Sequence, residues 1–133
     1  MRFTKLTPVI YAADLHAEAR FYTELGFEAR YPEGDAEAGE MGGFVALRQG
    51  EVEFGVEFSD RFRARAANDT VLWQFQIDDL AEAARLCERL GLRHTAPRRD
   101  WERPDAWEMR VTSPNGYEVS LEGPMPARHQ EVR

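Results

Sequence analysis

The chain has 133 residues, of which 43% are hydrophobic and 31% are charged, and its formal net charge is −7 at pH 7. A chain of this length can bury one hydrophobic core, and no apolar run reaches the roughly 20 residues that a membrane-spanning helix needs. The acidic balance disfavours a nucleic-acid partner, because binding to phosphates needs a concentrated basic surface. We therefore expect a cytoplasmic protein with no membrane or nucleic-acid partner and with a neutral or cationic ligand.

The first half of the chain predicts one strand, one helix and three further strands. Residues 6–11 are rich in β-branched and aromatic side chains, as strands are, and Asp14 follows as a helix N-cap. Apolar residues at helical spacing continue to Leu25, after which Gly26 can adopt the left-handed conformation that ends a helix. Three segments with strand character follow, at 27–33, 44–48 and 51–58.

The second half repeats this pattern after a polar, arginine-rich stretch. Residues 59–69 have no apolar periodicity and predict a linker. The elements predicted beyond it are a strand at 71–77, a helix at 80–90 capped by Asp79, and strands at 92–98, 107–112 and 116–122. We therefore expect a single domain over 1–123, with module one at 1–58, a linker at 59–69, module two at 70–123, and a frayed tail at 124–133.

The two halves also share residues in one register. Six identities occur at a constant offset of 65 residues: Asp14-Leu15 with Asp79-Leu80, Ala19-Arg20 with Ala84-Arg85, and Leu25-Gly26 with Leu90-Gly91. A duplicated unit explains this, in which each curved sheet buries one face under its helix and leaves the other to line a cavity. The predicted fold class is α+β, with two tandem βαβββ modules forming a curved mixed sheet around a half-open cavity.

Two longer motifs point to a known family. F-Y-x-x-L-G-F at 21–27 and S-P-N-G-Y-E-V-S-L at 113–121, with the D-L opening of the first helix, resemble the vicinal oxygen chelate superfamily. That superfamily includes glyoxalase I, extradiol dioxygenases and the bleomycin resistance proteins, and the resemblance covers about residues 6–122. It implies the duplicated fold and a homodimer. It does not fix the reaction, because the scaffold hosts lyases, dioxygenases, epimerases and binding proteins.

The resemblance also implies where a metal ion would be held. Metal-dependent members carry a His, Gln or Glu on the first strand of each module and a Glu on the last strand. The matching positions are Thr7, Leu72 and Ser120. Leucine has no donor atom and a neutral hydroxyl is a poor ligand in this role, so we expect no metal cofactor.

Other residues with reactive side chains give no separate site. His16, His94 and His129 fall on none of the implied ligand positions, and we expect them at the surface or in packing. Cys87 is the single cysteine and lies in the second predicted helix, which excludes an intramolecular disulfide and favours a buried apolar role.

Alternation along the strands predicts the lining of the cavity. With the implied ligand positions marking the cavity side, polar and acidic residues face inward and bulky apolar residues such as Ile10, Trp73 and Phe75 face the helices. Compensating arginines such as Arg48 and Arg110, or a cationic ligand, are expected beside the glutamates. The candidate ligand-binding residues are Tyr11, Phe44, Glu57, Gln74, Gln76, Trp101, Trp107, Arg110 and Glu122.

Three functions are compatible with these residues. The leading hypothesis is a metal-free binding protein that sequesters a cationic or aromatic small molecule, because aromatic faces beside carboxylates suit such ligands. An alternative is a divalent-metal-dependent lyase or dioxygenase, with Glu57 and Glu122 as ligands two residues out of register. A third is a non-catalytic dimeric accessory module. Trp101 and Trp107 are candidates both for ligand contact and for anchors of a dimer interface.

Overall fold

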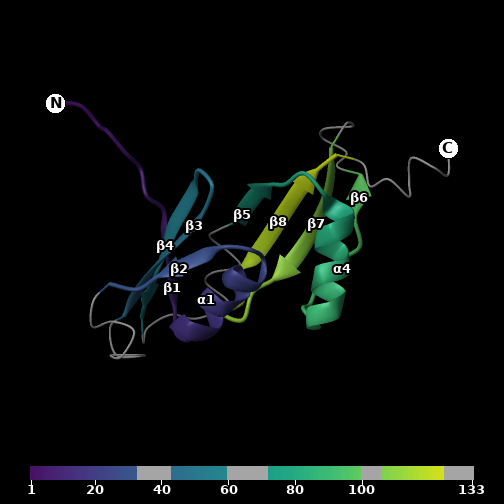
Figure 1. The fold of residues 1–133 in the computed structure, drawn as a ribbon, viewed down its shortest axis with the longest axis horizontal. Coiled ribbons are helices and arrows are strands. Elements are labelled where there is room, and N and C mark those ends of the chain that lie inside the picture. Colours follow the sequence, from purple (N-terminus) through teal and green to yellow (C-terminus); the bar gives the residue numbers. More distant parts are fainter. Residues whose placement is uncertain (33–42, 60–71, 100–105, 125–133) are drawn as a thin grey trace. The chain divides into compact units, whose positions relative to one another are not determined.

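The computed structural model describes residues 1–32, 43–59, 72–99 and 106–124. The chain divides into two compact units, Met1–Arg63 and Ala64–Arg133, and the division falls inside the predicted linker, whose residues from 60 onward lie outside the described residues. Within these described ranges, each unit has one four-stranded mixed sheet and one helix (Figure 1). None of the helices in the described ranges has the length and apolar character needed to cross a membrane.

The first unit has the predicted order of one strand, one helix and three strands. Its elements are β1 (Val9–Ala12), α1 (Leu15–Glu24), β2 (Glu28–Arg30), β3 (Phe44–Gln49) and β4 (Val52–Phe58). The sheet order is β1-β4-β3-β2, and β1 is parallel to β4 while the other pairs are antiparallel. The parallel pair joins the first and last strands of the module, with the helix as part of the crossover.

The second unit repeats this topology. Its elements are β5 (Leu72–Gln76), α4 (Leu80–Leu90), β6 (Arg98–Arg99), β7 (Trp107–Thr112) and β8 (Glu118–Gly123). The sheet order is β5-β8-β7-β6, and β5 is parallel to β8. Figure 1 shows α4 running along one side of this sheet, and α4 contacts β7 and β8. The predicted α+β class and the duplicated βαβββ order are thereby confirmed.

Both helices begin at the predicted caps. The Asp14 carboxylate accepts a hydrogen bond from the backbone N–H of Ala17 at 3.0 Å, and that of Asp79 accepts one from the backbone N–H of Glu82 at 3.0 Å. Each bond satisfies a backbone donor that has no partner within the helix. The same interaction therefore recurs at the offset of 65 residues.

Both helices also end in the same way. Gly26 and Gly91 have φ angles of 103° and 68°, a region that side chains disfavour. The residue after each glycine donates a backbone hydrogen bond of 2.9 Å to the carbonyl five residues earlier: Phe27 to Tyr22, and Leu92 to Cys87. These turns reverse the chain toward the next strand.

Side-chain alternation separates a helix-covered face from the opposite face in each sheet. We call the opposite face the open face, although its β8 residues Ser120 and Glu122 are themselves buried. In β1, Ile10 and Ala12 are buried while Val9 and Tyr11 are 44% and 53% exposed. The core of the first unit lies between α1 and its sheet, with buried residues Ile10, Ala12, Leu15, Ala19, Phe21, Tyr22, Val45, Leu47, Phe54 and Val56. The core of the second unit contains Leu80, Cys87, Met109, Val111, Tyr117, Val119 and Leu121.

The sixth predicted strand is wrong in extent. We expected residues 92–98, but the structure has an isolated bridge between His94 and Val111 and a two-residue strand at Arg98–Arg99. Pro97 lies between them and has no backbone N–H to donate, which interrupts the pairing with β7. The other strands begin and end within three residues of their predicted limits.

Replacing either cap aspartate tests the helix starts. We expect Asp14→Ala and Asp79→Ala each to lower the free energy of unfolding by about 1 kcal/mol, because each leaves a backbone N–H without its acceptor. Urea denaturation at neutral pH measures this change. Asp14→Asn and Asp79→Asn keep the capping oxygen and should recover most of the loss. A loss in the Asn variants as large as in the Ala variants would show that charge, rather than the hydrogen bond, is responsible.

Candidate functional site

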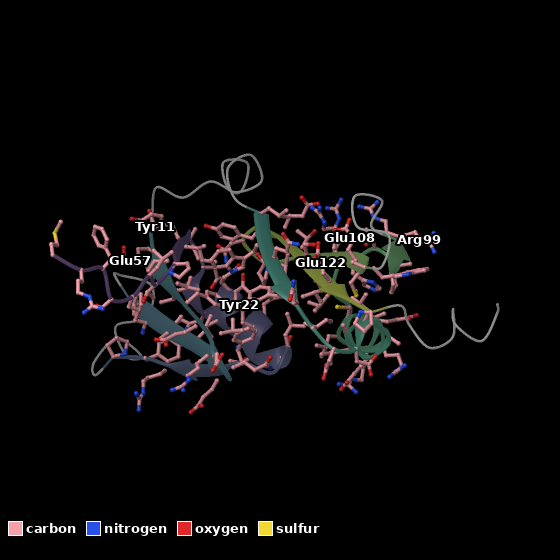
Figure 2. All side chains as sticks on the ribbon, turned by 90° about the horizontal axis from the view of Figure 1, so that it is seen from above. Tyr11, Tyr22, Glu57, Arg99, Glu108 and Glu122 are labelled. Carbon is pink, nitrogen blue, oxygen red and sulfur yellow. The ribbon has the colours of Figure 1, made fainter. Side chains whose placement is uncertain are left out.

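A row of three side chains crosses the open face of the first sheet. Tyr11 on β1 and Phe44 on β3 both pair in register with Glu57 on β4, so the carboxylate lies between two aromatic residues. Figure 2 shows Tyr11 and Glu57 beside each other. We call Tyr11, Glu57 and Phe44 the aromatic–acidic row. Cross-strand neighbours in one row have Cβ atoms about 5 Å apart, within reach of one small ligand.

The end of the Phe44 ring lies not over Glu57 but over Gly55, two residues earlier on β4. A Cβ atom added to Gly55 would lie 2.5 Å from Cζ of Phe44 and 3.5 Å from Cγ2 of Val9. The far end of the ring therefore occupies the space that a side chain at residue 55 would need. The open face consequently carries an aromatic surface over β4 beside the Glu57 carboxylate.

The two glutamates of β4 that share this face differ in their surroundings. Nζ of Lys5 lies 3.2 Å from Oε1 of Glu53, forming an exposed ion pair. Glu57 is exposed, and within the described part of the chain it has no hydrogen bond or ion pair. An exposed carboxylate therefore lies between two aromatic residues on this face.

The open face of the second sheet holds a connected ion-pair network. Oε1 of Glu108 lies 3.1 Å from Nη2 of Arg98, and its Oε2 lies 3.4 Å from Nε of Arg110. The Ser120 hydroxyl donates to Oε2 of Glu108 at 3.2 Å. Nη1 of Arg110 also lies 3.3 Å from Oε2 of Glu118. We call these five residues the Glu108 network, and its charges neutralise one another.

The network lowers the pKa of Glu108. Burial acts in the opposite direction and is the largest single influence, since it disfavours the charged carboxylate. The positive charge of Arg110 and the hydrogen bonds from Arg98, Ser120 and Arg110 together outweigh burial, and the pKa falls below the ordinary value of 4.5. Glu108 is therefore a carboxylate held in its ionised form by its neighbours.

Three further predicted residues, Gln74, Gln76 and Glu122, lie on the same face of the second sheet. Glu122 on β8 pairs in register with Glu108 on one side and Gln76 on the other, and it is 5% exposed. Gln74 pairs in register with Ser120 and is exposed. Figure 2 shows Glu122 and Glu108 near each other in this unit. The open face of the second sheet is therefore polar, with most of its charge paired internally.

The residues at the implied metal positions do not fit a metal ion. Thr7 precedes β1 and is exposed, Leu72 is an exposed alkyl group on β5, and the Ser120 hydroxyl is engaged by Glu108. Among the described residues, no three His, Cys, Asp or Glu side chains gather closely enough to hold a metal. A hard cation beside Glu108 would also meet two arginines, whose positive charges oppose it.

The predicted site residues that the structure describes fall into one group in each unit, and one of them joins neither group. Tyr11, Phe44 and Glu57 share the open face of the first sheet, while Gln74, Gln76, Arg110 and Glu122 share that of the second. Trp107 does not join them: it pairs in register with Gly123, which alternation places on the helix-covered side with Met109. Trp101 lies outside the described residues.

Sequence reasoning missed two residues that shape these faces, Glu108 and Arg98, and it placed Gly55 on the correct face without predicting its contact with Phe44. Glu108 and Arg98 build the ion-pair network, and Gly55 accommodates the Phe44 ring. The alternation in 107–112 could have found Glu108, because it shares a parity with Arg110 and is opposite to Met109 and Val111. Arg48, expected to compensate the glutamates, donates from Nε to the carbonyl of Gly50 at 3.2 Å.

The histidines have packing or surface surroundings where they are described. Nδ1 of His16 lies 3.3 Å from the hydroxyl of Tyr31, and the two ring centroids are 5.6 Å apart. Nδ1 of His94 lies 3.1 Å from the carbonyl of Thr95. His129 lies outside the described residues. Neither described histidine belongs to the two open faces.

Comparison with solved structures identifies the fold. The chain is similar to a bleomycin resistance determinant encoded on the transposon Tn5 (TM-score 0.71, 20% identity, 92% of this chain and 98% of that one). It is similar to a bleomycin-binding protein complexed with bleomycin (TM-score 0.70, 20% identity, 92% and 100%). It is also similar to a glyoxalase family protein from Enterococcus faecalis (TM-score 0.71, 22% identity, 92% and 99%).

These structures define the class of fold. The chain has the glyoxalase/bleomycin resistance fold, and its structural neighbours include both bleomycin resistance proteins and glyoxalase family proteins. No protein-family model and no curated protein sequence matches the chain. At these identities the likeness concerns the fold, so the function is argued from the residues.

The lowered pKa of Glu108 gives a pH-dependent prediction. A carboxyl whose pKa is lower in the folded state than in the unfolded state stabilises the fold above its unfolded pKa, and this stabilisation is lost as the pH falls through the folded value. We expect Glu108→Gln to lower the free energy of unfolding at pH 7 by about 1–3 kcal/mol, because two arginines lose their carboxylate. The difference between wild type and variant should shrink as the pH is lowered below 4.5 toward the native pKa.

Chemical denaturation between pH 3 and pH 7 measures this difference. Glu53→Gln is the matched control, since Glu53 forms an exposed ion pair on the other sheet and should change the stability little. A Glu108→Gln effect that is the same at every pH would contradict the proposed role of its ionised form.

Proposed function

We propose that this protein binds a small cationic or aromatic molecule, sequestering it without a metal ion. The observation that carries this proposal is the aromatic–acidic row, in which Glu57 lies between Tyr11 and Phe44 and is exposed. Aromatic faces attract cations through their quadrupoles, and a carboxylate adds direct charge complementarity. Flat aromatic groups can in addition stack on the same rings.

The overall charge and the fold support this choice of ligand. The net charge of −7 favours the approach of cations over anions. One structural neighbour is a bleomycin-binding protein complexed with bleomycin, so this fold can hold a small molecule. Arginines engage the Glu108 carboxylate of the second sheet, whereas Glu57 of the first sheet is exposed and has no ion pair among the described residues.

Location and assembly belong to the same proposal. We expect the protein to act in the cytoplasm as a homodimer. β1 and β5 each lie at the edge of their sheet and expose apolar side chains, Val9 at 44% and Leu72 at 48%. Exposed sheet edges pair readily with other strands, which supports association of two copies. Analytical ultracentrifugation measures the assembly.

Calorimetric titration tests ligand binding. We expect bleomycin or the flat cation 9-aminoacridine to bind with detectable heat at a protein concentration of about 100 μM, where millimolar or tighter affinity is measurable. Glu57→Gln removes the available charge and should weaken binding of the cation about two- to fivefold, the magnitude of one exposed cation interaction.

Glu53→Gln is the matched control for this titration. It removes an equal charge from the same strand and face, but from a carboxylate that Lys5 already engages. We expect it to change the affinity less than Glu57→Gln does. Absence of heat with both probes, or equal losses in the two variants, would contradict the proposal.

Metal dependence is tested separately. We expect chelation followed by dialysis to leave the affinity for 9-aminoacridine unchanged, because no implied ligand position carries a suitable donor group. Thermal melting in the presence of zinc, nickel, manganese or magnesium should likewise leave the melting temperature unchanged, since only a ligand of the native state raises it. A metal that raised the melting temperature at micromolar concentration would favour the lyase or dioxygenase alternative.

A further inference from the structure

The two modules have the same strand topology but carry different side chains at matching positions of their open faces. At the offset of 65 residues, Tyr11 corresponds to Gln76, Glu57 to Glu122, and Gly55 to Ser120. The register is also conserved, because Tyr11 pairs with Glu57 as Gln76 pairs with Glu122. The third member of each row is Phe44 in the first sheet and Glu108 in the second. Equal backbones therefore present an aromatic row in one module and an amide and two carboxylates in the other.

The difference at residue 55 decides where the aromatic ring lies. The partner of Phe44 across the ladder is Glu57, yet the ring reaches diagonally to Gly55, where an added Cβ would be 2.5 Å from its Cζ. Val9 borders the same space, with Cγ2 at 3.5 Å from that point. In the second module Ser120 fills the equivalent position and donates to Glu108. A side chain at residue 55 would have to displace the end of the Phe44 ring, so glycine favours the position of the ring over β4.

We propose that the first module alone carries the recognition surface, that Gly55 is its positioning residue, and that the preferred ligand is an arylalkylammonium ion. This inference rests on the proposed function and makes it more specific. The aromatic group of the ligand packs on the Phe44 ring over Gly55. Its ammonium group lies beside Glu57 and the ring of Tyr11.

The spacing of the two rows sets the size of the ligand. Residues two apart on a strand point to the same face and are separated by about 7 Å, so the Gly55 row and the Glu57 row lie about that far apart. The ammonium group contacts the Glu57 carboxylate from the side that faces Gly55, so its nitrogen does not span the whole distance between the rows. We therefore expect about 5–6 Å between the centre of the ligand's ring and its nitrogen. 2-Phenylethylammonium and 3-phenylpropylammonium meet this requirement, and benzylammonium is too short.

The second module lacks the parts that this recognition needs. Its row is Gln76, Glu122 and Glu108, and the carboxylate of Glu108 already has Arg98 and Arg110 as partners. A ligand ammonium would have to displace these arginines or lie beside their positive charges. One probe molecule per chain is therefore expected, although the fold is duplicated.

Protein-observed NMR titration of the full chain tests this inference with benzylammonium, 2-phenylethylammonium and 3-phenylpropylammonium. We expect the two longer ions to bind several-fold more tightly than benzylammonium, with one site per chain. The backbone amide shifts should be largest in β1, β3 and β4. 2-Phenylethanol, which lacks the charge, should bind about two- to fivefold more weakly than 2-phenylethylammonium, and Glu57→Gln should reduce this difference.

A double-mutant cycle tests the role of Gly55. Gly55→Ala displaces the flexible end of the Phe44 ring, and Phe44→Ala removes the ring; each should weaken 2-phenylethylammonium about two- to fivefold. If Gly55 acts through Phe44, the double variant should lose no more than Phe44→Ala alone. Ser120→Ala is the matched control at the equivalent ladder position, and it should leave the affinity unchanged. Thermal melting confirms that each variant is folded.

The outcomes separate this inference from the proposed function. The inference would be overturned by any of four results: additive losses in the cycle, amide shifts centred on β5 and β8, two probe molecules per chain, or equal affinity for all three ions. Binding of 9-aminoacridine would still support the proposed function in each case. Failure of 9-aminoacridine, bleomycin and every phenylalkylammonium ion to bind the wild-type chain would overturn both. If Gly55→Ala does not fold, Phe44→Ala and the ion series decide the question.

Discussion

The parallel pairing of the first and last strands in each module places the residues that form the two open faces. This pairing joins positions more than forty residues apart in the sequence, Tyr11 with Glu57 and Gln76 with Glu122. Since strand side chains alternate, it also fixes which residues share a face. A shift of one residue would turn Glu57 toward the helix and expose Val56, which is fully buried. This shift is unfavourable because it would bury the Glu57 carboxylate, so the register that places Glu57 on the open face is favoured.

The same backbone supports two different chemical surfaces. In the second sheet, Ser120 and two arginines hold Glu108 as an ionised carboxylate, and the network has little charge left to offer a ligand. In the first sheet, Gly55 admits an aromatic ring and Glu57 remains exposed. The two modules have the same topology, but different side chains on their open faces give the two sheets different chemical properties. The proposed ligand follows from the surface that the first sheet presents.

Much of the fold could be predicted because its signals are local. Asp14 and Asp79 mark the starts of the helices as N-cap residues, and Gly26 and Gly91 mark their ends. Alternation in β1 separates Tyr11 from the buried side chains. The sixth strand was misjudged because apolar alternation alone does not register that Pro97 lacks a backbone donor. Trp107 was expected at the ligand, yet its register partner Gly123 places it on the other face.

The site was less predictable because it depends on contacts between strands. Arg98 meets Glu108 only through the pairing of β6 with β7, and Ser120 meets it only through that of β7 with β8. The position of the Phe44 ring over Gly55 depends on a diagonal contact between β3 and β4. Such contacts require both the register and the side-chain rotamers, neither of which the sequence shows directly.

The most direct measurement is a crystal structure of the complex with 9-aminoacridine. The ligand should stack on Phe44, with a protonated nitrogen within ion-pair distance of the Glu57 carboxylate. A ligand bound instead against Glu108 and Arg110, or a metal ion held by Glu122 on the second sheet, would contradict the assignment of recognition to the first module.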